Sequence, residues 1–280
     1  MVEINKKHTL HRLIVVCKEN EKLIAYALKD ELNVPVEMGV IMEVNTMQDA
    51  EYIFDKFSGV FDIIVWLMSD QSRGDMNNML NSNEYIIKKR ALSVIPVMFG
   101  RFIIPFGFFT TFPVVSNTGD IRALAENVSK VIKNYLHINL MSLMPFAFEN
   151  LVKDVLKVYH FENITLTYSD HVDFGYDMMC TYDKGSEIEK GDWLVEIKYT
   201  KEERFTIRNI DALIKQDRGH YLPDNKLMLV TNGIMTSVIV EYVESLIDNQ
   251  KLSIYIVDGW KLCNLIAFND ELVKAYFPYE

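Results

Sequence analysis

The segment Trp193-Leu-Val-Glu-Ile-Lys-Tyr199 decides how the second half of this chain folds. Its aromatic and β-branched residues predict a strand, and successive side chains of a strand point to opposite faces. Glu196 and Lys198 therefore share one face, and Val195 and Ile197 share the other. A carboxylate and an ammonium on an otherwise apolar strand are costly unless they are paired or take part in chemistry. The segment thus predicts a strand that carries a charged site.

A second carboxylate precedes this strand. Asp177 ends an earlier extended run, Gly175-Tyr-Asp177, nineteen positions before Glu196. We expect a strand–turn–strand unit in which Asp177 meets Glu196 across the hairpin. Two carboxylates and a lysine in that setting are suited to hold a divalent metal beside a scissile phosphate, because Mg²⁺ prefers oxygen ligands. Asp170 and Asp173 also precede the hairpin, and Asp173 is the alternative ligand.

A third carboxylate lies in the segment from Pro145 to His160. Apolar residues recur there at helical spacing behind an initial proline, which predicts a helix. Glu149 stands three positions before Val152, on or beside the apolar stripe, whereas Asp154 falls on the polar face. We interpret Glu149 as a member of the site. The alternative is that Glu149 only interacts with the dipole at the helix N-terminus.

Taken in this order, the helix with Glu149, Gly-Tyr-Asp177 and Glu196-Ile-Lys198 resemble the PD-(D/E)xK nuclease superfamily, in particular the Mrr-like restriction endonucleases. The resemblance covers roughly residues 144–270. It extends to the run Lys226-Leu-Met-Leu-Val-Thr-Asn-Gly and to Asp258-Gly-Trp-Lys-Leu262. It implies a restriction-endonuclease-like α/β domain with a mixed sheet.

The resemblance also implies a reaction, the metal-dependent hydrolysis of double-stranded DNA in a restriction or anti-phage role. A partner chain of a defence system would belong to that role. Asp177 and Glu196 would bind Mg²⁺ or Mn²⁺, with the main-chain carbonyl of Ile197 as a further ligand. Glu149 would hold the metal through water or fix the other ligands in place.

Two further residues complete the implied site. Lys198 would orient the attacking water or stabilise the phosphate. Gln216, on a helix expected over residues 210–218, would add a polar group. The alternative to catalysis is a degenerate nuclease fold in which Glu196 and Lys198 form a static ion pair.

The first half of the chain alternates short apolar runs with amphipathic segments, which predicts a parallel sheet with helices on both faces. We expect strands at Leu13–Cys17, Met38–Met42, Phe61–Met68 and Leu92–Met98, and helices at Glu21–Leu32, Asp49–Phe57, through Tyr85–Lys89 and at Asp120–Leu136.

This half resembles the Toll/interleukin-receptor (TIR) fold through the strand that ends at Ser69 and through Val94-Ile-Pro-Val-Met98. A flavodoxin-like or receiver-like sheet is the alternative. The TIR resemblance implies self-association into a homo-oligomer. Enzymatic TIR domains cleave NAD with a glutamate in the helix after the serine-ended strand, here Glu84. The tryptophan usual in that pattern is absent, and Glu84 stands a few residues late. A non-catalytic signalling scaffold is the third hypothesis.

Length and charge limit these hypotheses. The 280 residues suit two α/β domains, expected at 1–140 and 141–280. The net charge is −10, and residues 145–280 hold 14 Lys and Arg against 23 Asp and Glu. DNA-binding domains usually carry excess positive charge, so we expect weak DNA affinity in the monomer and a dependence on oligomerisation. One group of basic residues follows the predicted active strand. These residues could form a basic strip near the phosphates, or they could simply lie on a solvated surface: Lys198, Lys201, Arg204, Arg208, Lys215 and Arg218.

The remaining patterns exclude several other classes of site. Cys17, Cys180 and Cys263 are scattered and predict neither a disulfide framework nor a zinc site. No Gly-rich phosphate-binding loop is present. No signal segment stands at Met1–Thr9, and the apolar run Phe102–Val115 is too short to span a bilayer. We expect a cytoplasmic protein that does not act on membranes.

Overall fold

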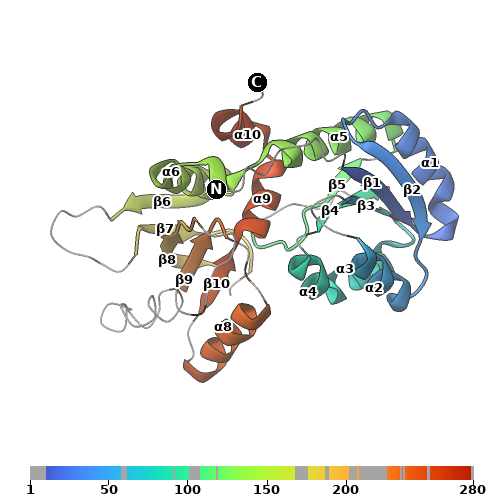
Figure 1. Cartoon of the computed structure of the whole chain (residues 1–280). Helices are drawn as coiled ribbons and strands as arrows, with labels where there is room; N and C mark the ends of the chain where they lie inside the picture. Colours follow the sequence, from blue (N-terminus) through green and yellow to red (C-terminus); the bar gives the residue numbers. More distant parts are fainter. Residues whose placement is uncertain are drawn as a thin grey trace, which may run out of the picture. The chain divides into compact units, whose positions relative to one another are not determined.

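The computed structural model describes residues 11–57, 62–90, 92–100, 108–117, 119–167, 176–186, 189–201, 207, 226–233, 235, 237–250 and 253–278. The chain forms two compact units, each with a five-stranded sheet (Figure 1). The first unit comprises Met1–Phe106 and Thr110–Leu136, and the second comprises Gly107–Phe109 and His137–Glu280. Among the described residues, no helix has both the length and the apolar character needed to cross a membrane.

The first sheet is parallel throughout, as predicted, and runs in the order β2-β1-β3-β4-β5. This is the order of doubly wound sheets of the flavodoxin-like type, in which the winding reverses between β1 and β3. The central strands are continuous apolar runs because both of their faces are covered. The strands are β1 (Arg12–Cys17), β2 (Glu37–Glu43), β3 (Asp62–Ser69), β4 (Ser93–Phe99) and β5 (Val115–Asn117).

Helices cover both faces of this sheet, as predicted. Figure 1 shows α1 and α5 on one side and α2, α3 and α4 on the other. A hydrogen bond from the N–H of Asn33 to Oγ of Ser129 (3.0 Å) joins the chain after α1 to α5. The helices are η1 (Glu19–Glu21), α1 (Lys22–Glu31), α2 (Met47–Lys56), α3 (Arg73–Ser82), α4 (Glu84–Lys89) and α5 (Ile121–His137).

One helix of the first unit was not predicted. The sequence between the strand that ends at Ser69 and the helix through Tyr85–Lys89 is rich in polar residues, yet α3 occupies most of it. Met76, Met79 and Leu80 recur at three- and four-residue spacing and are buried. Their burial against the core stabilises a helix whose remaining residues are poor helix formers.

The second sheet is mixed, as predicted, and runs in the order β10-β9-β8-β7-β6. The β6–β7 and β7–β8 pairs are antiparallel, whereas β8–β9 and β9–β10 are parallel. Its strands are β6 (Phe161–Leu166), β7 (Met178–Tyr182), β8 (Gly191–Lys198), β9 (Lys226–Thr231) and β10 (Ile254–Val257). Its helices are η2 (Leu140–Ser142), α6 (Pro145–Val158), α8 (Ser237–Gln250), α9 (Gly259–Ala267) and α10 (Asp270–Tyr276).

Both faces of the second sheet are covered. Glu196 pairs in register with Leu229, and Leu229 packs in a cluster with Ile239 and Val243 of α8. On the opposite face, the ring of Phe148 on α6 lies 5.7 Å from that of Tyr199. Figure 1 shows α6 and α8 on opposite sides of this sheet. Strand β8 is therefore central and buried from both sides.

An aromatic cluster forms part of the second core, and two of its members come from before the expected domain boundary. The ring of Phe108 lies 4.9 Å from that of Phe161, and the ring of Phe109 lies 4.8 Å from that of Tyr255, both in edge-to-face orientation. Such pairs add favourable electrostatics to apolar burial. Phe108 and Phe109 therefore belong to the second unit, although they precede residue 140.

Helix α9 was also not predicted, because Asp258-Gly-Trp-Lys-Leu262 was assigned only as part of the family resemblance, without a secondary structure. Oδ1 of Asp258 accepts the N–H of Lys261 (2.9 Å) and Oδ2 accepts the N–H of Met235 (3.1 Å), so this aspartate is an N-cap. A Cβ on Gly259 would lie 2.4 Å from the carbonyl oxygen of Asn232. Only glycine permits this close approach between α9 and the end of β9.

The aromatic cluster provides a test of the second core. Phe108→Ala should lower the free energy of unfolding by about 3–5 kcal/mol, because the Phe108 side chain is 1% exposed and its loss leaves a cavity. Phe146→Ala is the matched control, since Phe146 is 66% exposed and its change should stay within about 0.5 kcal/mol. Urea unfolding followed by circular dichroism measures both. Equal effects of the two substitutions would contradict the placement of Phe108.

Candidate active site

Asp177 lies where β7 begins, beside the end of β8. It directly precedes β7, and the residues of the predicted extended run before Tyr176 lie outside the described part of the chain. Its N–H donates to the carbonyl of Val195 (2.9 Å), and its Oδ2 accepts the N–H of Ile197 (2.6 Å). The carboxylate thus accepts a hydrogen bond that a main-chain carbonyl would accept in a regular pair of strands. Asp177 and the Glu196-Ile-Lys198 segment meet across the antiparallel pair.

Glu196 and Lys198 lie on one face near the end of β8 and form an ion pair. The Glu196 side chain is 7% exposed and the Lys198 side chain is 38% exposed. Burial of a carboxylate is costly, and a neighbouring ammonium offsets part of that cost. The pair therefore holds a charged carboxylate inside the protein while its ammonium reaches solvent.

The chain after Lys198 is fastened on two sides. The hydroxyl of Tyr199 donates to the carbonyl of Leu143 (2.8 Å), close to the start of α6. Asn232, directly after β9, exchanges two hydrogen bonds of 2.8 Å with the main chain of Thr200. Because Asn232 is buried, these bonds satisfy its amide and fix the end of β8. The contacts of Tyr199 and Asn232 were not predicted, although an Asn-Gly pair after a strand does signal a turn.

Glu149 is half-buried on α6. Its neighbour Phe148 contacts Tyr199, directly after β8. Within the described ranges, no three His, Cys, Asp or Glu side chains come close enough together to hold a metal ion. The structure therefore unites Asp177 with the Glu196–Lys198 segment and does not add Glu149 as a third clustered carboxylate.

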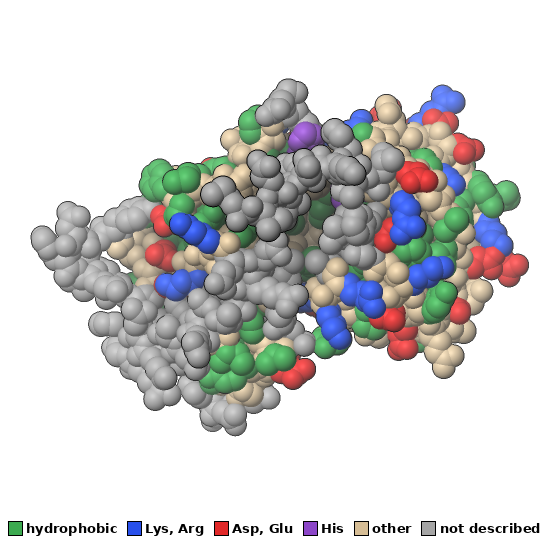
Figure 2. All heavy atoms as spheres, in the orientation of Figure 1, with side chains coloured by type: hydrophobic (Ala, Val, Ile, Leu, Met, Phe, Trp, Pro, Cys, Tyr) green, Lys and Arg blue, Asp and Glu red, His purple; other side chains and the backbone are tan. Residues whose placement is uncertain are grey.

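Several predicted residues lie outside the described part of the chain. They are Asp170, Asp173, Gln216 and the basic residues Arg204, Arg208, Lys215 and Arg218. On the described surface of the first unit that Figure 2 shows, Lys and Arg side chains alternate with Asp and Glu, with no continuous basic patch.

The glutamate proposed for NAD cleavage is paired within its own helix. Glu84 is the first residue of α4, and its Oε1 lies 2.5 Å from Nζ of Lys88, one turn later. Doubly wound sheets bind ligands at the carboxyl ends of their strands, where the winding reverses. A cavity lies there, between β1 and β3, and Glu84 is not among its described lining residues. The geometry of Glu84 is that of a surface ion pair.

The three cysteines are held as neutral thiols. Burial raises the pKa of Cys17 to about 11, and the nearby carboxylate of Glu21 adds to this effect. Burial likewise raises the pKa of Cys180 and of Cys263 to about 12. Because the thiolate is the nucleophile, none of the three is activated for covalent catalysis at neutral pH.

No protein family and no curated protein matches the sequence. Among solved structures, the MspJI restriction endonuclease in complex with a 27-mer oligonucleotide is similar at 14% identity and a TM-score of 0.33. That likeness covers 54% of this chain and 35% of the MspJI chain, so this chain spans about a third of that protein. A hypothetical protein from Thermus thermophilus is similar at 8% identity and a TM-score of 0.29, over 96% of this chain and 79% of that one. Likenesses this distant identify no function.

The cysteine environments predict slow thiol chemistry. In the native protein at about pH 7.5, all three cysteines should react with Ellman's reagent far more slowly than after unfolding in urea, since each pKa lies well above that pH. The release of thionitrobenzoate measures this reaction. One fast-reacting thiol in the folded protein would show that a thiolate forms there.

The bond from Ile197 to Asp177 predicts a difference between two substitutions. Asp177→Ala removes the acceptor of a nearly buried N–H and should cost about 1–3 kcal/mol of stability. Asp177→Asn keeps a side-chain oxygen that can accept the same bond and should cost less. Chemical denaturation compares the two variants. If both are equally stable, the bond does not contribute to folding.

Proposed function

We propose that the second unit is a metal-dependent endonuclease that hydrolyses phosphodiester bonds of double-stranded DNA. The observation that carries the proposal is the 2.6 Å bond from the N–H of Ile197 to Oδ2 of Asp177. It holds one carboxylate beside the segment that contributes a second carboxylate, Glu196, and an ammonium, Lys198. The mixed sheet, with α6 ahead of β7 and β8, agrees with the PD-(D/E)xK resemblance.

The chemistry of these donors suits Mg²⁺ or Mn²⁺. An ionised carboxylate has about four lone-pair sites, so Asp177 could accept the bond from Ile197 and also coordinate a cation. Asp177, Glu196 and the carbonyl of Ile197 would hold the ion. Mg²⁺ is often held by only one or two carboxylates and keeps several waters, so a third clustered carboxylate is not required. Glu149 would act through one of those waters.

The bound ion would lower the pKa of a coordinated water and neutralise charge on the phosphate. Lys198 would add a positive charge from the protein to that of the bound ion. Its ammonium has three N–H donors, and its contact with Glu196 uses only part of that capacity. A partly exposed ammonium held in this way can donate to a phosphate oxygen or to the attacking water. Glu196 would orient Lys198 as well as bind the ion.

The net charge of −10 affects how the substrate would be held. An acidic protein gains little from long-range attraction to DNA, so the proposed enzyme would bind weakly as a monomer. Assembly through the first unit would multiply the phosphate contacts and raise the affinity. A restriction or anti-phage role, with a partner chain, extends the proposal and rests on the resemblance alone.

Lys198→Ala should reduce plasmid cleavage by about 100-fold or more in the presence of Mg²⁺ or Mn²⁺, because a charged donor to the reacting phosphate is removed. Asp192→Asn is the matched control. Asp192 is an exposed carboxylate on the same strand that accepts a hydrogen bond from the hydroxyl of Thr181 (2.9 Å). Its substitution should leave cleavage unchanged. Agarose-gel assays at several protein concentrations measure nicking and linearisation.

The same variants separate the proposal from the static ion pair. Isothermal titration with Mn²⁺ in the absence of DNA should show binding to the wild-type protein and weaker binding to Asp177→Asn. Absence of both Mn²⁺ binding and cleavage, in a folded protein, would identify a degenerate nuclease. Equal cleavage by the wild-type protein and Lys198→Ala would reject the proposed catalytic role of the lysine.

A further inference from the structure

The main chain that follows β8 is held by the side chain of an asparagine. The pairing of β8 with β9 ends at Lys198 and Thr231, which lie opposite each other in register. Asn232 comes next, and its Oδ1 accepts the N–H of Thr200 while its Nδ2 donates to the carbonyl of Thr200, both at 2.8 Å. A side-chain amide offers the same kinds of donor and acceptor as a peptide group. Asn232 therefore holds Thr200 as a further residue of β9 would.

The turn that carries Asn232 is itself fixed by α9. The N–H of Gly233 donates to Oγ1 of Thr231 (3.1 Å), and its carbonyl accepts the N–H of Gly259 (2.8 Å). The main chain at Gly259 also lies so close to the carbonyl oxygen of Asn232 that a Cβ there would be 2.4 Å from it. Asn232 is buried, and well-packed interiors leave side chains little room to shift. The position of this turn is thus passed on to Thr200.

Tyr199 holds the same stretch of chain through its own side chain. Its hydroxyl donates to the carbonyl of Leu143 (2.8 Å), directly before α6 begins, and its ring packs 5.7 Å from the ring of Phe148 on α6. Nδ2 of Asn232 reaches the same turn, where it contacts Sδ of Met141 (2.9 Å). The residues directly after β8 are therefore tied both to the turn after β9 and to the turn before α6.

Lys198 is the member of the candidate site whose position depends most on these ties. It is the last residue of β8 and directly precedes Tyr199. Its ammonium stands on a flexible four-carbon stem, and its side chain is 38% exposed, so packing alone does not hold it. Its main chain and its contact with Glu196 set its position. Asp177, in contrast, is held by the N–H of Ile197.

We propose that Tyr199 and Asn232 are positioning residues of the nuclease reaction. They fix the main chain beside Lys198, so that its ammonium is held where it can donate to the phosphate or to the attacking water. This inference rests on the nuclease function proposed above. In this role neither residue touches the substrate or the metal. A misplacement of about 1 Å can cost about 100-fold in rate, so the two residues act on kcat more than on DNA binding.

Two substitutions in the full-length protein test this role. Tyr199→Phe removes one hydroxyl and keeps the ring, and Asn232→Ala removes both bonds to Thr200. In plasmid cleavage with Mn²⁺, kcat should fall by about three-fold or more in Tyr199→Phe and by about ten-fold or more in Asn232→Ala. The KM for DNA should stay within about two-fold of the wild-type value, because no contact with DNA is removed.

A second measurement is independent of catalysis. Hydrogen–deuterium exchange of the metal-free protein, followed by mass spectrometry over residues 193–201, should be faster in Asn232→Ala, because the N–H of Thr200 loses its acceptor. Isothermal titration with Mn²⁺ in the absence of DNA should give an affinity within about two-fold of wild type, since the bond between Ile197 and Asp177 remains.

Tyr276→Phe and Asn269→Ala are the matched controls, which make the same chemical changes elsewhere in the second unit. The hydroxyl of Tyr276 donates to Oδ2 of Asp154 (2.7 Å), and Oδ1 of Asn269 accepts the N–H of Leu272 (3.0 Å) where α10 begins. Both controls remove a hydrogen bond that stabilises the fold, and both should keep the wild-type kcat. Thermal unfolding verifies that every variant is folded at the assay temperature.

The possible results separate this inference from the function on which it rests. A wild-type protein that neither binds Mn²⁺ nor cleaves DNA would reject the nuclease function, and the positioning role with it. Three results in a protein that does cleave DNA would overturn the positioning role alone: wild-type kcat in both variants, equal losses of kcat in the two controls, or unchanged hydrogen exchange over residues 193–201 in Asn232→Ala.

Discussion

The second unit depends on one hydrogen bond, from the main-chain N–H of Ile197 to the carboxylate of Asp177. At 2.6 Å it is short, and its acceptor carries charge, which makes it stronger than a bond between neutral groups. It joins the start of β7 to the end of β8 at a point where a side chain substitutes for a strand carbonyl. The position of Asp177 relative to Glu196 follows from it.

The packing of the second sheet restrains the start of β7 and the end of β8. Strand β8 lies at the centre of the sheet and is covered on both faces, so its main chain has little freedom to shift. Asn232 fastens the residues that follow it, and Gly259 allows α9 to approach the end of β9. The ion pair with Lys198 lets Glu196 stay charged inside this packing. Packing and polar contacts thus place Asp177 and Glu196 where β7 begins and β8 ends.

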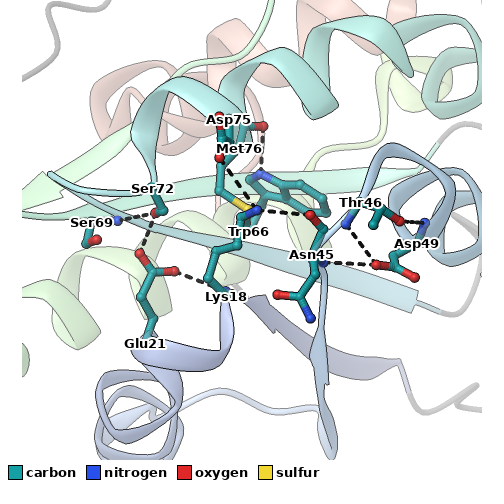
Figure 3. Close-up of polar contacts among 10 residues, drawn as sticks. All are labelled: Lys18, Glu21, Asn45, Thr46, Asp49, Trp66, Ser69, Ser72, Asp75 and Met76. Atoms are coloured by element: carbon teal, nitrogen blue, oxygen red, sulfur yellow. Dashed lines mark hydrogen bonds and ion pairs between the residues drawn. The ribbon is translucent and has the colours of Figure 1, made fainter.

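Each unit contains a buried glutamate, and different groups stabilise the carboxylate in the two units. Each holds a nearly buried glutamate near the end of a strand, and a buried carboxylate requires hydrogen bonds or a counter-charge. In the first unit, Glu21 accepts hydrogen bonds from the hydroxyl of Ser72 and the main-chain N–H of Lys18 (Figure 3). In the second unit, Glu196 is stabilised by an ammonium that reaches solvent. The second arrangement is the one that the proposed nuclease reaction would use.

The sequence by itself determined the features that depend on local periodicity. Apolar runs alternating with amphipathic segments were sufficient to predict the parallel first sheet, and the two-residue spacing was sufficient to place Glu196 and Lys198 on one face. These follow from the repeat of a helix or a strand, which nearby residues specify.

Only the tertiary structure decided which distant segments meet. Phe108 and Phe109 enter the second core, α3 and α9 form because their apolar residues find buried surroundings, and Asp177 lies directly before β7 with its carboxylate bonded to the end of β8. Only the structure could also show that no three carboxylate, histidine or cysteine side chains cluster within the described residues. Each depends on contacts between residues far apart in the chain, and local sequence patterns do not encode such pairings.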